Sequence, residues 1–339
     1  MAVSVKDVAH AASVSVGTVS NVLNRPDKVA PATVARVHEA IERLGFVRND
    51  AARQLRAGRS RSIGLIVLDS ANPFFAEVAR GAEDRAAREG MTVLLGNSDQ
   101  NPERERAYLD LFREQRVNGV LLTPTDLADP ALVTAGIPLV LVDGELPGGQ
   151  VPSVTVDDIE GGQLAAAHLL SLGRRRLAFV GGPLSIRQVA DRLEGARRAI
   201  AEAATRTGSQ HARASLEVIE LDALTVLAGR DAGERIARRP AAERPDAVFC
   251  ANDLLAVGVL QGTAILGEVR VPDDLAIVGY DDIDFAQSTV VPLSSIRQPA
   301  REIGATAVDL LLAALADPHS AVRHVRFRPE LVVRASTGG

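Results

Sequence analysis

Residues 63–95 read IGLIVLDSANPFFAEVARGAEDRAAREGMTVLL. Two apolar runs, at 63–68 and 92–95, enclose a segment of helical composition at 74–89. Short and nearly continuous apolar runs are typical of strands that are buried on both faces of a parallel sheet. The stretch therefore predicts a strand–helix–strand unit, which is the repeating element of a doubly wound α/β fold.

The same alternation continues along the chain, with one interruption near residues 151–160 that predicts two doubly wound lobes with parallel sheets. In such folds ligands bind outside the carboxyl ends of the strands, so we expect a ligand in the cleft between the lobes. Further strands are predicted at 119–122, 139–142, 177–180, 216–219, 247–250 and 275–278, and helices at 103–116, 160–171, 192–203, 225–238 and 254–266.

Residues 4–45 have a different pattern, with three short helices and no strand. Ser4 and Ser15 are suitable N-caps for the first two helices, and Pro31 is suited to the first position of the third. Two helices joined by a three-residue turn and braced by a third predict an all-α helix-turn-helix head. The expected helices span 6–12, 16–24 and 31–44.

Charge is distributed unevenly along the 339 residues. The whole chain has a formal net charge of −5, yet residues 1–62 carry +5 and the remainder −10. A basic head on an acidic body indicates that one end binds a polyanion, although a basic surface that is merely solvated is the alternative. No apolar run approaches the ~18 residues of a membrane span, and the first ten residues lack a signal-peptide core. We therefore expect a soluble, cytoplasmic protein.

Catalytic and metal-binding patterns are weak. The single cysteine excludes an internal disulfide, and the six histidines lack metal-ligand spacing, so no metal or cofactor is predicted. Gly181-Gly182-Pro183 follows a strand but lacks the lysine of a phosphate-binding loop. Asp281 and Asp282 are adjacent and point apart, and no serine lies in a GxSxG motif. The sequence therefore does not predict an enzyme.

Residues 3–24, VSVKDVAHAASVSVGTVSNVLN, resemble the N-terminal signature of LacI/GalR-family repressors. The resemblance covers essentially the whole chain, with further motifs in order. It implies a dimeric or tetrameric DNA-binding regulator, usually a repressor, with a periplasmic-binding-protein-like effector domain. The later motifs are Ile63–Ile66, Asn72–Phe75, Val117–Val120, Gly181–Pro183, Ala251–Asp253, Gly279–Asp282 and Ile296–Pro299.

The resemblance also implies the domain organisation. Residues 1–48 would form the DNA-binding head, 49–61 a hinge helix and linker, and 62–339 the effector-binding and dimerisation domain. The first lobe is expected at about 62–159 and 291–320, and the second at about 160–290 and 321–339. The chain ends without an apolar heptad tail, which favours a homodimer over a tetramer.

Operator recognition is implied for the second helix of the head. In the family, the positions of Val16, Gly17 and Asn21 are the main base readers. Val16 offers apolar contact, Gly17 offers no side chain, and Asn21 is suited to bidentate pairing with adenine. A pair of such heads in a dimer implies a pseudopalindromic operator of double-stranded DNA. The remaining implied DNA contacts are Ser4, Ser15, Thr18 and Ser20.

The segment that follows the head resembles the family's hinge helix. Leu55 matches the position whose side chain inserts into a minor-groove step and kinks the duplex. Asn49 and Ala52 belong to the same DNA-contacting set. The family commonly has proline just before Asn49, whereas this chain has Arg48.

Effector contacts are implied for the cleft, where Phe74 and Phe75 match the aromatic residues that hold a sugar ring in relatives. The family's ligand-clamping arginine falls at Ala190, for which Arg187 and Arg192 are possible substitutes, although Arg192 matches a structural position. A second aromatic falls at Ala223 or Leu224. The matching polar contacts are Asp126, Asp143, Asn252, Asp281 and Gln298.

The expected function is therefore an operator-binding repressor controlled by a small molecule, with a sugar or related hydroxylated metabolite as effector. Three alternatives stay open at this point. One is a regulator that responds to a nucleobase or nucleoside. The second is a periplasmic-type solute-binding protein, which would lack the head, and the third is a sugar-modifying enzyme, which would need catalytic groups that the sequence does not offer.

Overall fold

The computed structural model divides into two compact units, residues 1–60 and 61–339. It describes residues 3–46, 61–129, 132, 136–205, 214–266, 269–317, 319 and 321–338. The hinge segment predicted at 49–61, with Asn49, Ala52 and Leu55, therefore lies outside the described residues except for Arg61.

The first unit contains the three predicted helices around a small apolar core. Ser4 caps the first helix in a capping box with Asp7, and Ser15 caps the second by accepting a hydrogen bond from the backbone of Thr18. Gly45 ends the third helix with φ of +60°, a conformation that favours glycine. The elements are α1 (Val5–Ala11), α2 (Val16–Asn24), the short 3-10 helix η1 (Pro26–Lys28) and α3 (Pro31–Leu44).

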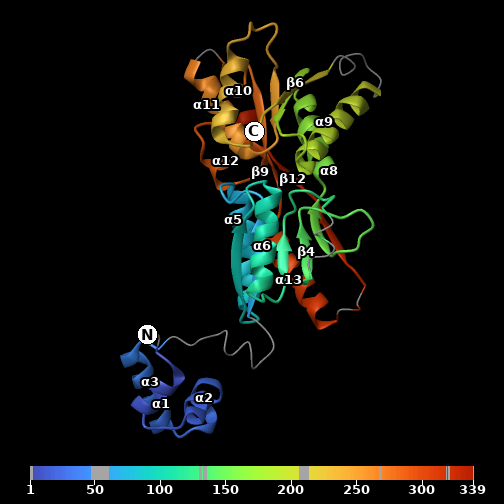
Figure 1. The fold of residues 1–339 in the computed structure, drawn as a ribbon. Helices are drawn as coiled ribbons and strands as arrows, with labels where there is room; N and C mark the ends of the chain where they lie inside the picture. The colour runs from blue at the N-terminus through green and yellow to red at the C-terminus, as the bar shows by residue number, and fades with distance from the viewer. Residues whose placement is uncertain are drawn as a thin grey trace. The chain divides into compact units, whose positions relative to one another are not determined.

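The first lobe of the second unit is built on a six-stranded sheet in the order β11-β5-β4-β3-β1-β2, and all its strand pairs are parallel. Figure 1 shows α5, α6 and α13 beside this sheet. The elements are β1 (Ser62–Val67), α5 (Pro73–Ala87), β2 (Thr92–Asn97), α6 (Pro102–Glu114), β3 (Val120–Leu122), β4 (Leu139–Val142), β5 (Ser153–Val156), α13 (Ala300–Ala316) and β11 (His324–Phe327).

The second lobe has a sheet in the order β12-β10-β9-β8-β6-β7, which is parallel except for the antiparallel edge strand β12. One continuous buried core extends through both lobes. The elements are α8 (Asp158–Ser171), β6 (Arg176–Gly181), α9 (Arg187–Thr205), β7 (Ser215–Glu220), α10 (Val226–Ala237), β8 (Ala247–Cys250), α11 (Asp253–Leu266), β9 (Ala276–Asp281), α12 (Asp284–Ser288), β10 (Ser294–Arg297), β12 (Glu330–Val332) and the 3-10 helix η3 (Ala335–Thr337).

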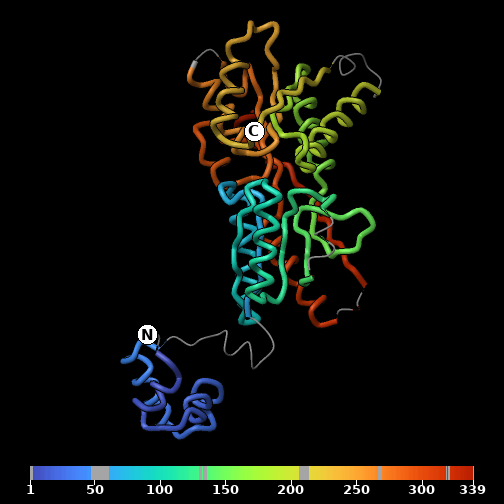
Figure 2. Tube along the Cα trace, in the orientation of Figure 1, coloured from blue at the N-terminus to red at the C-terminus, as the bar shows by residue number. Residues whose placement is uncertain are grey.

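The predicted fold class is confirmed, and every predicted strand and helix of the α/β body is present within a few residues. The expected lobe boundaries were wrong at two places, because β10 belongs to the second sheet and β11 to the first. The chain therefore passes between the lobes after β5, between β10 and α13, and between β11 and β12, as the trace in Figure 2 shows. These late strands are short and mix polar with apolar residues, so they lack the continuous apolar runs that identify the buried strands.

The packing of α5 against α13 fixes the position of the first-lobe aromatic residues. A Cβ on Gly81 would collide with the backbone of Arg301, and a Cβ on Gly304 would collide with the backbone of Val78. The two helices can therefore approach this closely only because each presents a glycine to the other. This contact holds α5, which carries Phe74 and Phe75 in its first turn.

Candidate functional site

The exposed face of α2 carries the residues that the sequence predicts as base readers. Val16, Gly17 and Asn21 are exposed, whereas Val19 and Val22 on the opposite face are buried in the head core. Val16 leaves 43% of its surface accessible, so its side chain is free to make apolar contact with a partner. The helix thus presents these three positions together on one accessible surface.

The predicted polar contacts of the head also have local structural roles. The hydroxyls of Ser15 and Thr18 lie 2.9 Å apart at the start of α2. Ser20 Oγ accepts a hydrogen bond of 3.3 Å from the side-chain amide of Asn24. Ser4 donates to the carboxylate of Asp7 at 2.7 Å. Each of these hydroxyls is therefore oriented by a neighbour one helical turn away.

A cavity of about 50 Å³, here called the deep cavity, lies between the lobes at the carboxyl ends of their strands. Six of the nine predicted effector residues line it. The first lobe contributes Phe74, Phe75 and Asp143, and the second contributes Arg192, Asn252 and Asp281. This is the position that the doubly wound fold predicts for a ligand.

The two phenylalanines are buried, with 4% and 7% of their surfaces accessible, and both belong to the main apolar core. Their rings are 5.2 Å apart between centroids and meet edge to face at 69°. Each ring therefore serves two purposes, since it packs into the first lobe and also borders the deep cavity.

Asp281 connects the lobes at the floor of the deep cavity. Its Oδ2 accepts a hydrogen bond of 3.1 Å from Asn72 of the first lobe, and its Oδ1 accepts one of 2.7 Å from Gln298. Asn72 also caps α5, because its Oδ1 accepts from the backbone of Phe74 at 3.0 Å. Burial raises the pKa of Asp281, although Arg192, Asn72 and Gln298 oppose that shift.

Asp143 forms the second polar link between the lobes. The side-chain amide of Gln188 donates to the Asp143 carbonyl at 2.7 Å and to Asp143 Oδ2 at 3.0 Å. Burial, together with repulsion from Asp158, raises the pKa of Asp143 from its usual 3.8 to about 7. This carboxyl group is therefore close to half-ionised at neutral pH.

Arg192 lines the deep cavity but is held by groups of its own lobe. Its Nε donates to Asp158 at 2.7 Å, its Nη1 donates to the Ala251 carbonyl at 2.7 Å, and its guanidinium lies 3.6 Å above the ring centre of Tyr280. Burial alone would lower the pKa of Arg192, but the neighbouring carboxylates raise it. Arg192 is therefore permanently charged and already paired with Asp158.

Two predicted residues line a different space. Asp126 and Arg187 border a second cavity of about 590 Å³, here called the outer cavity, which is adjacent to the deep one. Arg187 also donates to the carbonyl of Glu145 in the other lobe at 3.2 Å. Neither side chain borders the deep cavity.

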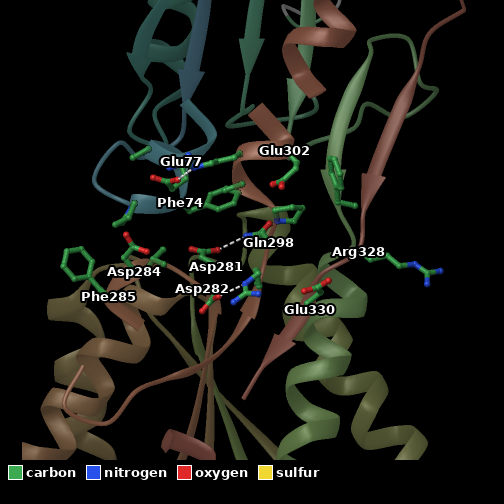
Figure 3. A pocket seen from close by; sticks show the side chains of 18 residues that line it. Phe74, Glu77, Asp281, Asp282, Asp284, Phe285, Gln298, Glu302, Arg328 and Glu330 are labelled. Atoms are coloured by element: carbon green, nitrogen blue, oxygen red, sulfur yellow. Dashed lines mark hydrogen bonds and ion pairs between the residues drawn. The ribbon is translucent and has the colours of Figure 1, made fainter. Parts of the chain in front are cut away.

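Gln298 lies on the other side of Asp281, where a third cavity of about 700 Å³ is bordered by the β10–α13 and β11–β12 connections (Figure 3). Gln298 is buried and reaches the deep cavity only through its hydrogen bond to Asp281. Charged groups around the third cavity pair with one another, as Glu77 does with Arg301 at 2.6 Å. Gln298 therefore orients Asp281 and does not border the deep cavity itself.

Sequence reasoning missed four polar residues of the site. Asp69, Asn72, Gln100 and Gln188 line the deep cavity but were not predicted as contacts. Gln100 follows β2, so its position after a strand could have indicated it. Gln188 precedes Arg192 by one helical turn of α9, so helical spacing could have indicated it. At the predicted second-lobe aromatic position, Leu224 lines the cavity and supplies no ring.

Within the described part of the chain, no group of three or more His, Cys, Asp or Glu side chains could hold a metal ion. No helix among the described residues is both long and apolar enough to cross a membrane.

Family models match both parts of the chain. Residues 4–49 match the model of bacterial regulatory proteins of the lacI family, and residues 166–337 match a periplasmic binding protein-like domain. The HTH-type transcriptional repressors PurR of Aliivibrio salmonicida and of Aliivibrio fischeri strain MJ11 are 33% and 34% identical to this chain. Each match covers 98% of both chains.

Solved structures agree with this relationship. The Lac repressor dimer bound to operator and the anti-inducer ONPF has a TM-score of 0.80 at 26% identity and covers 99% of both chains. A transcriptional regulator CelR–cellobiose complex has a TM-score of 0.69 at 29% identity and covers 98% of this chain and 99% of that one. A LacI family regulator from Enterococcus faecium with bound ribose has a TM-score of 0.71 at 28% identity, over 81% of this chain and 98% of that one.

The chain has a helix-turn-helix head and a two-lobed α/β body, and its relatives match it over nearly their whole length. It therefore belongs to the LacI family and is a DNA-binding transcriptional repressor with an effector-binding domain.

Proposed function

We propose that this repressor is controlled by a neutral, hydroxyl-rich small molecule, a sugar, bound in the deep cavity between its lobes. The proposal is carried by one observation, the convergence of carboxylates and amides from both lobes beside two phenylalanine rings. Carboxylate and amide oxygens accept hydrogen bonds from hydroxyls, and aromatic rings pack against the C–H faces of a sugar. The known complexes of relatives with cellobiose and ribose support the same ligand class.

The charge of the cavity argues against an anionic effector. Asp143 and Asp281 border it, whereas the only cation among its described lining residues, Arg192, is already paired with Asp158. A phosphate or carboxylate group would therefore enter a buried site whose positive charge is already compensated, at a large desolvation cost. A neutral ligand avoids that cost.

Three of the seven non-glycine residues with positive φ in the described part of the chain line this cavity. Gln100, Asp143 and Asp281 line the cavity with φ values of +55°, +58° and +102°, which residues other than glycine rarely adopt. Such conformations cost about 1–3 kcal/mol each, persist where the surrounding structure enforces them, and occur often at functional sites. Their presence here supports a ligand site at this position.

A nucleobase or nucleoside is the second candidate, because a base has N–H donors for the carboxylate of Asp281 and a planar face for an aromatic ring. The edge-to-face arrangement of Phe74 and Phe75 provides no pair of parallel rings between which a planar base would lie. For that reason we favour the sugar.

For the DNA complex we propose a homodimer that places two copies of α2 in successive major grooves of a pseudopalindromic operator. Val16 and Asn21 would contact base edges, while Ser4, Ser15, Thr18 and Ser20 would contact phosphates. The segment with Asn49, Ala52 and Leu55 would fold as a hinge helix in the minor groove. An effector with different affinities for two arrangements of the lobes would then change the affinity for the operator.

We expect Gly17→Ala to stabilise α2 while changing operator recognition. A Cβ at Gly17 has room, since its nearest neighbour would be Ser15 Oγ at 3.6 Å. Alanine is favoured over glycine inside a helix by about 0.5–1 kcal/mol. Slower amide exchange in α2, together with altered operator affinity and unchanged non-specific binding, is the expected result in the full-length protein.

Gly45→Ala is the matched control, because its φ of +60° makes alanine unfavourable there. This variant should accelerate amide exchange in α3. Faster exchange in α2 of Gly17→Ala would contradict the prediction, since it would mean that the glycine is required by the fold.

The effector proposal is tested by titration calorimetry of the full chain with ribose, glucose, cellobiose, glucose 6-phosphate, adenine and adenosine. We expect saturable binding of at least one neutral sugar, weaker binding of the phosphorylated one, and a change in operator affinity when the sugar is present. In Asp281→Ala, unpaired ligand hydroxyls should reduce sugar affinity by about 5- to 150-fold. Asp231→Ala, an exposed aspartate on α10, should bind normally. Binding of adenine or adenosine without any sugar would overturn the proposal.

A further inference from the structure

We propose that the effector is a disaccharide, with one ring in the deep cavity and the other in the outer cavity. Gln100 and Gln188 would contact the ligand where the two cavities meet and thereby select for the second ring. This inference rests on the proposed function, because it specifies the size and class of the sugar at that same site.

The two cavities are parts of one site. Leu68, Gln100, Asp143, Ile186 and Gln188 line both of them, and we call this shared boundary the neck. A ligand that touches any of these side chains from the deep cavity therefore lies beside the outer one.

The two cavities differ in size. The deep cavity, at about 50 Å³, is too small for a second ring beside the first. The outer cavity, at about 590 Å³, is within the size range of small-molecule sites and has room for a further ring.

The outer cavity has the lining that a sugar ring requires. Hydrogen-bonding groups are supplied by Asp126 and Ser185, and apolar surface by Pro124, Leu127 and Pro147. Asp126 Oδ1 accepts from the backbone of Ala128 at 2.8 Å. Among the described residues its Oδ2 has no partner, so that oxygen is available to a ligand hydroxyl.

The neck offers two amides with unused hydrogen-bonding capacity. Gln188 donates twice to Asp143 through Nε2, and its Oε1 accepts no hydrogen bond from the described residues. The side-chain amide of Gln100 makes no hydrogen bond with the described residues, and its backbone is held at φ of +55°. Two amides from opposite lobes therefore face the point at which a glycosidic linkage would pass.

Charge favours a neutral second unit over a phosphate-bearing one. Arg187 lies 3.4 Å from Asp191 and donates to the Glu145 carbonyl, so its charge is partly compensated. The carboxyl groups of Asp126 and Asp143, which line the same cavity, balance the remaining positive charge of Arg187. A second sugar ring fits this lining, whereas a nucleotide would bring uncompensated negative charge.

The test compares disaccharides with their constituent ring by titration calorimetry on the full chain. Cellobiose, maltose, lactose and trehalose are titrated against glucose as the single-ring probe. We expect at least one disaccharide to bind about tenfold or more tightly than glucose. In Asp126→Ala that disaccharide should lose about tenfold in affinity, whereas glucose should bind as it does to the unmodified chain. Gln100 borders both cavities, so Gln100→Ala should weaken both probes.

Gln261→Ala, an exposed glutamine on α11, is the matched control and should bind both probes normally. Glucose binding as tightly as every disaccharide, or Asp126→Ala weakening neither probe or both equally, would overturn the two-ring effector and leave a sugar-controlled repressor. If adenosine bound and none of the saccharides did, the sugar proposal itself would be overturned, and this inference with it.

Discussion

Arg192→Met is expected to lower the free energy of unfolding by about 3–5 kcal/mol, the cost of removing one partner from a buried ion pair. Arg192 and Asp158 leave only 6% and 7% of their side chains accessible, and their atoms are 2.7 Å apart. Asp281 lies 3.9 Å away and the ring of Tyr280 beneath the guanidinium. Without the arginine, two buried carboxylates would face each other with no cation, and the Ala251 carbonyl would lose its donor.

Urea unfolding followed by circular dichroism measures this effect, and Arg198→Met is the matched control on the same helix. Arg198 is half-exposed and pairs with Glu194 at 2.8 Å, so its loss should change the stability by no more than about 0.5 kcal/mol. The double variant Arg192→Met with Asp158→Leu should recover part of the lost stability, because no buried charge of that pair then remains uncompensated. Equal unfolding midpoints for Arg192→Met and Arg198→Met would refute the role of this ion pair.

Asp143→Asn is expected to stabilise the unliganded protein at pH 8 by up to about 4 kcal/mol and to have little effect near pH 4. The carboxyl pKa is about 7 in the folded chain, against a usual 3.8, so the folded state retains a proton that the unfolded state has lost. The resulting stability is fully present below pH 4 and is lost as pH rises through 7. Asparagine remains neutral, can keep the hydrogen bond with Gln188 and tolerates the φ of +58°.

Unfolding free energies measured between pH 5 and pH 8 test this prediction. The difference between Asp143→Asn and the unmodified chain should grow as pH rises to about 7 and then level off, while Asp231→Asn, at an exposed site on α10, should follow the unmodified chain throughout. A difference that does not change across this range would mean that the Asp143 carboxyl ionises freely in the folded protein.

Much of the fold can be predicted from the sequence, because its determinants are local. The caps at Ser4 and Ser15, the stop at Gly45 and the apolar runs of the central strands each lie within a few residues of the element that they define. Phe74, Phe75, Asn252 and Asp281 were selected as site candidates through the resemblance to LacI/GalR-family repressors, and Asp143 through its position at the end of a predicted strand. In the structure these residues lie at or just after the carboxyl ends of parallel strands, and that topology brings the ends of such strands to one edge.

Only the tertiary structure decided which of these side chains contact one another and what their burial and charge are. β10 and β11 belong to lobes that the sequence order does not indicate, since pairing between strands far apart in the chain selects the sheet. Gln298 was predicted to contact the effector but lies behind Asp281, and Gln188 was overlooked although it joins the lobes through Asp143. The pKa of Asp143 likewise depends on its burial and on Asp158, a residue of the other lobe. Burial and charge within the cavity result from three-dimensional neighbours, and no local pattern of residues specifies them.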